Sequence, residues 1–164
     1  MYRLKAHINH LLTATNQHGV HSPFVYSFVT RCLYAKPKFE GSKTMGVLLK
    51  SIAFFKIKTL DLITENQPIE RQIRKEFDLR IGQQKCYDLI YFDEASKVEL
   101  NAQKNSIHND SILLIDNIHT TKDRTELWNS LKQNTTVTVS IDLFYCGLLF
   151  FRKEQAKEHF KIRI

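Results

Sequence analysis

Two short apolar runs, each closed by an acidic residue, constrain the fold of this chain most. They are residues 87–93 (YDLIYFD) and residues 111–116 (SILLID). Each has the length of a strand that is buried on both faces, as the strands of parallel sheets are. Residues 97–105, which lie between them, can form a crossover helix. The two runs therefore predict parallel strands covered by helices.

The same alternation of strands and helices continues on both sides of these runs. Residues 59–64 (TLDLIT) are a further strand candidate, and Asn66-Gln67-Pro68 opens a predicted helix over residues 67–77. Another helix is predicted over residues 122–132. Residues 137–142 and 147–152 are β-rich and separated by only a few residues, which favours an antiparallel pair. We therefore expect a mostly parallel α/β sheet with an antiparallel edge.

The first third of the chain is predicted to be helical. A first helix has its apolar residues on one face, at Leu4, Ile8, Leu11 and Leu12. Ser22-Pro23 is typical of a second helix start, because serine caps the helix and proline fits its first position. Lys36-Pro37 ends this element, and a third helix is expected over residues 44–55.

Charge is distributed unevenly along the chain. The net charge is +7, from 24 Lys and Arg against 17 Asp and Glu. Residues 1–58 hold nine of the basic residues and the single acid Glu40, a local charge of +8, whereas residues 59–164 sum to −1. A basic face suits an anionic partner such as a nucleic acid. Without a nucleic-acid recognition motif, we favour a solvated helical face.

Length and composition predict one domain over residues 1–164. It would comprise a basic helical leader over residues 1–56 and an α/β core over residues 57–164. The longest apolar stretches are shorter than the ~18 residues of a membrane span, so we expect no membrane partner. The N-terminus lacks the pattern of a signal peptide. Cys32, Cys86 and Cys146 are expected to be reduced thiols, which is typical of a cytoplasmic protein.

Candidate site residues follow the two apolar runs. Asp93 ends the first run, and Asp116-Asn117 ends the second. Ligands of open α/β sheets bind at the carboxyl ends of strands, so these side chains are expected to converge. Two carboxylates and an amide are hard ligands suited to Mg²⁺ or Ca²⁺. The alternative is that each acid caps the next turn or helix.

Several segments resemble class I S-adenosylmethionine-dependent methyltransferases, in particular the O-methyltransferase-like group. The similar segments are HGVHSPFVYSFV, YDLIYFDEA, SILLIDNIH and VTVSIDLFYCGLLFFRKEQAKEHF. The resemblance covers roughly residues 15–60 and 87–164. It implies a Rossmann-like methyltransferase sheet that is mostly parallel, ends in an antiparallel hairpin and follows a helical N-terminal segment.

The resemblance also implies roles for individual residues. In metal-dependent O-methyltransferases, an Asp after the fourth strand and an Asp-Asn pair after the fifth hold a divalent ion. Asp93, Asp116 and Asn117 match those positions. His119 follows closely and is a candidate general base, since its ordinary pKa is near neutrality. A histidine in this position can also simply be part of a turn.

The chain departs from the family where S-adenosylmethionine should bind. The family carries a glycine-rich loop after its first strand, but no glycine lies between Gly46 and Gly82. Only 23 residues separate Ile63 from Tyr87, too few for the family's missing helices and strands. In an alternative alignment, residues 62–77 (LITENQPIERQIRKEF) are the end of the second strand and its helix, and Glu65 is the ribose-binding acid. Both alignments lose the glycine-rich loop.

These departures shape the expected structure and function. We expect a sheet reduced to about five strands, whose exposed surface favours a homodimer. We also expect a methyltransferase-like protein of the S-adenosylmethionine-dependent class, acting on a small-molecule acceptor if it is active, and impaired or inactive because the glycine-rich loop is missing. One alternative is a non-catalytic binding or assembly module, and a weaker one is a basic nucleic-acid-binding protein.

Overall fold

Eight helical segments and seven strands make up the described part of the computed structural model, which covers residues 1–36, 39, 41–94 and 96–164. Pro37, part of the predicted end of the second helix, lies outside these residues. The α-helices are α1 (Tyr2–Thr13), α2 (Pro23–Phe28), α3 (Lys43–Phe55), α4 (Gln67–Glu76), α5 (Leu100–Gln103) and α6 (Lys122–Gln133). A 3-10 turn, η1 (Gln17–Gly19), precedes α2, and a π-helical turn, η2 (Val29–Leu33), follows it.

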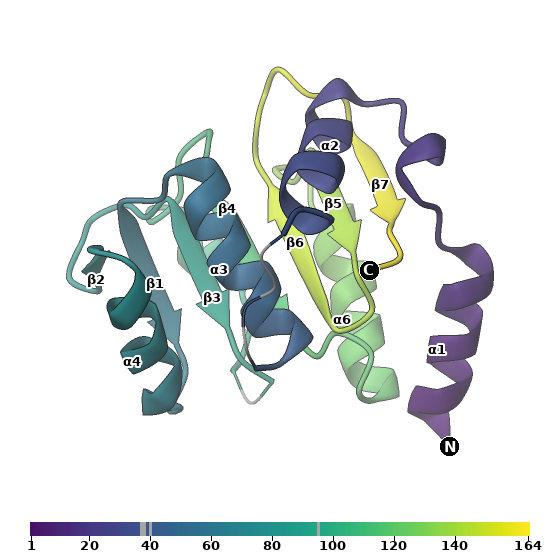
Figure 1. Cartoon of the computed structure of the whole chain (residues 1–164), viewed down its shortest axis with the longest axis horizontal. Helices are drawn as coiled ribbons and strands as arrows, with labels where there is room; N and C mark the ends of the chain where they lie inside the picture. Colours follow the sequence, from purple (N-terminus) through teal and green to yellow (C-terminus); the bar gives the residue numbers. More distant parts are fainter. Residues whose placement is uncertain (37–38, 40, 95) are drawn as a thin grey trace.

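The strands form one sheet. They are β1 (Thr59–Ile63), β2 (Arg80–Ile81), β3 (Leu89–Phe92), β4 (Ile112–Asp116), β5 (Val139–Asp142), β6 (Cys146–Phe150) and β7 (Glu158–Lys161). Their order is β2-β1-β3-β4-β6-β5-β7 (Figure 1). The β1–β2, β1–β3, β3–β4 and β5–β7 pairs are parallel, and β6 pairs antiparallel with both β4 and β5.

This topology confirms the expected fold class, a mostly parallel Rossmann-like sheet with a C-terminal antiparallel hairpin. From β1 the chain crosses through α4 to β2 on one side, whereas from β3 it proceeds to β4 on the other. The order therefore reverses between β1 and β3. Open α/β sheets bind ligands outside the carboxyl ends of the strands at such a switch point.

The expected number of strands was wrong, because the sheet has seven strands rather than about five. The two additional strands, β2 and β7, lie at opposite edges of the sheet. β2 has only two residues, and β7 has the sequence EHFK, so neither has the apolar run that identifies a buried strand. The β5–β6 hairpin was expected at the edge, but β7 covers it there.

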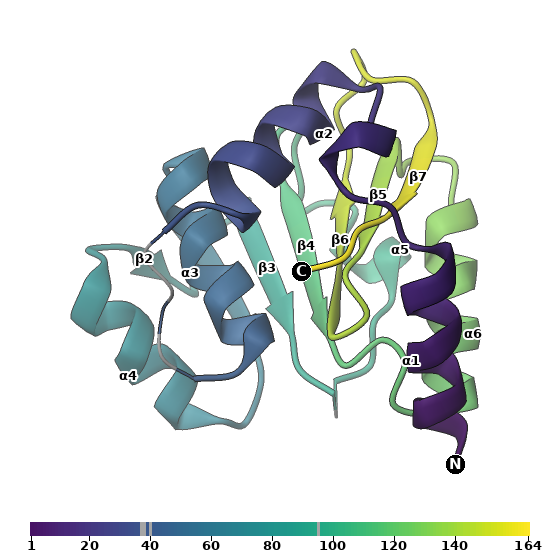
Figure 2. The same ribbon diagram turned by 45° about the vertical axis from the view of Figure 1, so that its right-hand side comes forward.

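Helices cover both faces of the sheet. Figures 1 and 2 show α2 and α3 in front of the sheet and α6 behind it. Successive side chains of β4 point to opposite faces of the sheet, which produces this division. Ile112 and Leu114 belong to the apolar cluster with α3, whereas Leu113 and Ile115 belong to the cluster with α6. Each of these four side chains is almost fully buried.

Local sequence signals set the starts of α2 and α3. The Ser22 hydroxyl accepts a hydrogen bond from the backbone of Val25, with Pro23 in the first turn, as predicted. The Ser42 hydroxyl does the same for Met45 at the start of α3. Both contacts satisfy backbone donors that have no partner inside the helix.

The cysteines are free thiols, as expected. Cys32 and Cys146 are buried, and burial raises the pKa of Cys32 to about 12.

Within the part of the chain that the structure describes, no helix combines the length and apolar character needed to cross a bilayer.

Candidate functional site

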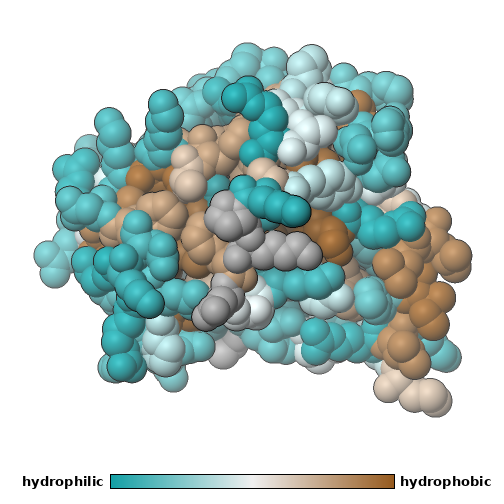
Figure 3. All heavy atoms as spheres, viewed as in Figure 1, coloured by the Kyte–Doolittle hydropathy of each residue, from teal (hydrophilic) through white to brown (hydrophobic). Residues whose placement is uncertain are grey.

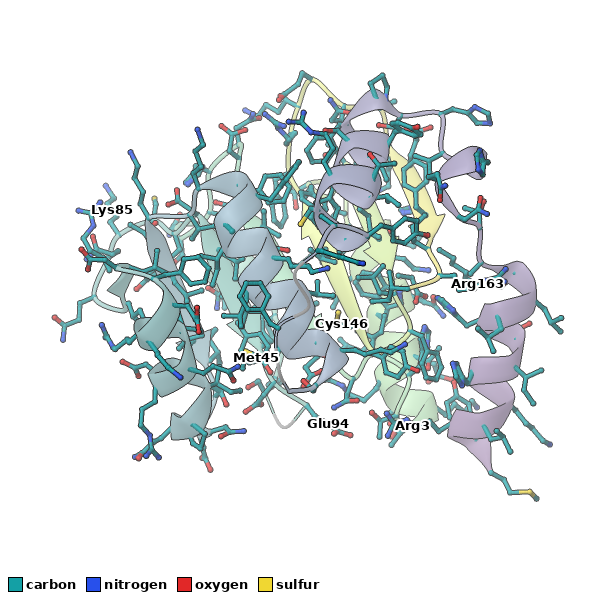
Figure 4. All side chains as sticks on the ribbon, in the orientation of Figure 1. Arg3, Met45, Lys85, Glu94, Cys146 and Arg163 are labelled. Carbon is teal, nitrogen blue, oxygen red and sulfur yellow. The ribbon has the colours of Figure 1, made fainter. Side chains whose placement is uncertain are left out.

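A pocket of about 430 Å³ lies at the switch point of the sheet. Its floor comes from the ends of β3 and β4 and from the residues that follow them. One wall comes from the start of α3, and another from the loop after β1 together with the first turns of α4. Its volume is in the range of small-molecule sites. Figure 4 labels Met45 of α3 and Glu94 of the loop after β3, which both line it.

Three carboxylates line this pocket: Asp93, Glu94 and Asp116. Asp93 and Glu94 follow β3, and Asp116 is the last residue of β4. They meet because β3 and β4 are parallel neighbours that end at the same edge of the sheet. The pocket therefore favours a ligand that carries positive charge or hydroxyl donors.

Asp116 is held by hydrogen bonds from three sides. The hydroxyl of Thr44 donates to its Oδ1 at 2.5 Å, and the phenol of Tyr91 donates to its Oδ2 at 3.3 Å. The backbone of Asn117 also donates to Oδ1, at 2.9 Å. Burial raises the pKa of the Asp116 carboxyl, and these hydrogen bonds oppose that shift. Burial and the Asp116 charge together raise the pKa of Tyr91, which stays a protonated donor.

Arg124 of α6 fixes the loops that carry the acids. Its guanidinium donates to the carbonyl oxygens of Asp116 at 2.7 Å, Ser96 at 3.3 Å and Asp93 at 3.5 Å. Burial lowers the pKa of Arg124, while Glu94 and the two aspartates oppose the shift. The backbone and hydroxyl of Ser96 also donate to Asp93 Oδ1, at 2.9 and 2.6 Å. The acidic floor is therefore preorganised by the protein itself.

The remaining walls were not predicted from the sequence. Gly41 and Ser42 line the pocket at the start of α3, and Gly41 has a φ of 110°, which favours glycine. On the opposite wall are Asn66, Pro68 and Gln72. The start of α3 itself lies within one residue of the helix predicted over residues 44–55. No sequence signal shows that this start lies over the end of β4.

The sequence-predicted residues do not all reach this pocket. Asp93, Asp116 and Asn117 do line it, so the structure brings the predicted trio together. Glu65 is exposed in the loop after β1 and is not among the lining residues, although its neighbour Asn66 is. His119 is not a lining residue either. The catalytic role of His119 and the ribose-binding role of Glu65 stay predictions.

His119 belongs to a second cluster, around Asp142 at the end of β5. Its Nε2 lies 2.8 Å from Asp142 Oδ2, and its Nδ1 lies 2.9 Å from the hydroxyl of Thr125. His10 of α1 approaches the other carboxylate oxygen at 3.2 Å. Burial alone raises the pKa of Asp142, but the hydrogen bonds from His10 and His119 and from the backbone of Phe144 hold it well below its ordinary value.

Carboxylate oxygens of the pocket are already engaged by the protein itself. The described residues contain no group of three or more His, Cys, Asp or Glu side chains that could hold one. Both oxygens of Asp116 already accept protein hydrogen bonds, as does Oδ1 of Asp93. The assignment of Asp93, Asp116 and Asn117 as ligands of Mg²⁺ or another divalent ion stays a prediction.

Comparison with solved structures yields a weak likeness. No protein-family model matches the chain, and no curated protein matches it. A crystal structure from Staphylococcus aureus, described provisionally as a caffeoyl-CoA O-methyltransferase, aligns with a TM-score of 0.43 and 12% sequence identity. The alignment covers 92% of this chain and 98% of that one. A likeness this weak assigns no function, which has to come from the residues of the pocket.

Proposed function

We propose that this chain is a methyltransferase-like protein of the S-adenosylmethionine-dependent class that is impaired or inactive in methyl transfer. It binds a small, positively charged or polyhydroxylated ligand at the switch point of the sheet. The observation that carries the proposal is the acidic pocket at the carboxyl ends of β1, β3 and β4. Open α/β sheets bind their ligands there.

The pocket matches the chemistry of S-adenosylmethionine in part. A sulfonium and an ammonium group suit the carboxylates of Asp93, Glu94 and Asp116, and ribose hydroxyls can donate to the same oxygens. The side chains of Met45 and Ile69 offer apolar contact for a base. When bound, the cofactor would supply an electrophilic methyl group. The protein's own contribution is to orient the ligand and to stabilise the positive charge of its cationic groups.

The loop after β1 argues for impaired catalysis. Residues 64–68 (TENQP) contain no glycine, and α4 begins at Gln67. Side chains of Asn66 and Pro68 occupy the wall where a glycine-rich loop would let the backbone approach the ligand. Proline also has no backbone N–H to donate. We therefore expect weak cofactor binding and slow or absent turnover.

Binding is tested by thermal unfolding in the presence of S-adenosylmethionine and of its demethylated product. We expect stabilisation that saturates in the high micromolar to millimolar range, because a ligand that binds the native state raises its stability. Glu94→Gln and Asp116→Asn should weaken this stabilisation. Asp123→Asn, which alters an exposed acid of α6 outside the pocket, should leave it unchanged.

Two results would contradict the proposal in different ways. If neither compound raises the unfolding temperature at millimolar concentration, the pocket does not bind this cofactor class, and the chain is better described as a binding or assembly module for another ligand. Conversion of the cofactor to its demethylated product at the ~1–1,000 s⁻¹ of ordinary enzymes, with a hydroxyl-bearing small molecule as acceptor, would show that catalysis is intact.

A further inference from the structure

Helix α1 packs on the protein through its polar side. His10 is 4% exposed and contacts the Asp142 carboxylate, and the His7 ring stacks on Phe144 with 4.3 Å between ring centroids. At the end of the helix, Arg163 donates to the carbonyl of Ala14. These contacts fix which face of α1 turns outward.

The outward face of α1 is aliphatic. Its side chains are Leu4, Ile8, Leu11 and Leu12, which are 64%, 51%, 41% and 80% exposed. Among the described residues, every exposed leucine or isoleucine lies on this helix. Figure 3 shows hydrophobic atoms gathered over α1 at one end of the molecule. A surface helix normally turns its apolar stripe to the core, so this reversed orientation indicates an external apolar partner.

The surroundings of the aliphatic stripe are positively charged. Residues 1–39 contain no Asp or Glu, and the exposed Lys5 lies on α1 itself. At the C-terminal end of α1, the Lys161 ammonium lies 3.4 Å from the Thr13 hydroxyl. Thr13 and Lys161 also line a pocket of about 470 Å³ with Lys132 and His159. Its one acid, Asp142, is already paired with two histidines.

We propose that α1 is an interfacial helix that docks this protein on a membrane surface containing anionic phospholipids. Its leucines would enter the acyl boundary, and the lysines around it would face the phosphate groups. The expectation of no membrane partner was based on the absence of a spanning segment. An interfacial helix lies on the bilayer and does not cross it.

Charge and area favour lipid over a second copy of the chain. Pairing α1 with α1 would bring together two helices that each carry Arg3 and Lys5 and no acidic residue. A helix of 12 residues is ~18 Å long and ~10 Å wide, so its stripe offers far less than the ~800 Å² per partner of a stable interface. A bilayer needs no such complementary patch.

The test is co-sedimentation of the whole protein with vesicles. Vesicles of phosphatidylcholine alone are compared with an equal mixture of phosphatidylcholine and phosphatidylglycerol. We expect clear binding to the mixed vesicles, weaker binding at high salt and little binding to the neutral ones. The double variant Leu4→Ser/Leu12→Ser should lose at least ~tenfold in binding, whereas Tyr26→Ser, an exposed apolar change on α2, should lose little.

Further measurements distinguish lipid binding from phosphate binding and from dimerisation. Lys5→Gln should weaken binding to the anionic vesicles. Inorganic phosphate should displace no more protein from them than chloride does at the same ionic strength. Far-ultraviolet circular dichroism should show the serine variants folded, because Leu4 and Leu12 are exposed. Equal binding to both vesicle types, full binding of the double variant, or displacement by phosphate beyond that caused by chloride would overturn the proposal. The proposal would also be overturned if the protein did not bind vesicles but formed a dimer that Leu4→Ser/Leu12→Ser dissociates. The aliphatic stripe would then be covered by a second copy of the chain.

Discussion

Asp142 shows how one buried charge connects distant parts of the chain. Its carboxylate is contacted by His10, which is 132 residues away in sequence, and by His119 from the loop after β4. No local pattern indicates such contacts, since they depend on how the first helix packs against the end of β5. The sequence could predict acids at strand ends, because that position follows from the apolar runs themselves. It could not predict which histidine each acid meets.

Replacing Asp142 with Asn should lower the free energy of unfolding by about 3 kcal/mol at pH 7, because it removes a buried carboxylate that two histidines and the Phe144 backbone contact and leaves these partners unmatched. The folded-state pKa of Asp142 is lowered. Its ionised form therefore adds stability above an unfolded-state value near ~3.9, and this contribution is lost as the pH falls through the lowered pKa.

Urea unfolding at neutral and acid pH measures both effects. The loss of stability on acidification should be smaller in Asp142→Asn than in the natural protein. Asp123→Asn, an exposed change in the first turn of α6, serves as the control. It should change neither the free energy of unfolding at neutral pH nor its loss on acidification by more than ~0.5 kcal/mol. An acid dependence that is identical in Asp142→Asn and the natural protein would contradict this role of Asp142.

At the scale of elements, apolar runs were predictable and polar contacts were not. Residues 59–64 and 111–116 predicted β1 and β4 to within one residue. The predicted helix over residues 97–105 shrinks to the four residues of α5. Ser96 explains part of this difference, because its hydroxyl contacts the Ile63 carbonyl and the Asp93 carboxylate and so ties Ser96 to the ends of β1 and β3.

Gly147 in β6 lies directly against the ring of Trp128 in α6. A Cβ atom there would lie 2.6 Å from the ring of Trp128, which α6 packs against the sheet. Gly147→Ala should therefore cost about 1–3 kcal/mol of unfolding free energy, since the indole has to move within a packed core.

Gly46 is the matched control for this substitution. It lies inside α3, and a Cβ atom at this position would meet nothing within 4 Å. Gly46→Ala should stabilise the protein by up to ~1 kcal/mol through helix propensity. Urea unfolding of both variants, followed by tryptophan fluorescence, measures whether each substitution raises or lowers the free energy of unfolding. A neutral Gly147→Ala variant would show that α6 is less tightly packed on β6 than the structure indicates.

At the scale of the whole molecule, two apolar clusters share one sheet. One contains Phe28 of α2 together with α3, and the other contains Trp128 of α6. Buried strands that alternate with helices predicted this layered architecture, since strands buried on both faces need helices on both. The extra strand β7 was not predictable in this way, because it is fixed by pairing with β5 and by the bridge from Thr15 to Ile162.

The shared strands should make the two clusters unfold together. Phe150 of β6 packs against Phe28 at a centroid distance of 6.0 Å, while the next residue along the strand, Leu149, belongs to the cluster of Trp128. Losing either cluster exposes one face of the same strands, so neither half of the sheet has a complete core alone. Phe28→Ala should therefore destabilise the environment of Trp128, although the two residues lie on opposite faces.

We expect Phe28→Ala to lower the free energy of unfolding by about 3–5 kcal/mol, because Phe28 is fully buried and its removal leaves a cavity. The chain has a single tryptophan, so its fluorescence reports the far cluster, and circular dichroism reports all helices. Both signals should shift to lower urea together, as in a two-state transition. Tyr26→Ala, on the exposed side of α2, should shift neither by much. Separate transitions in the two signals would mean that the helical segments before β1 unfold independently of the sheet.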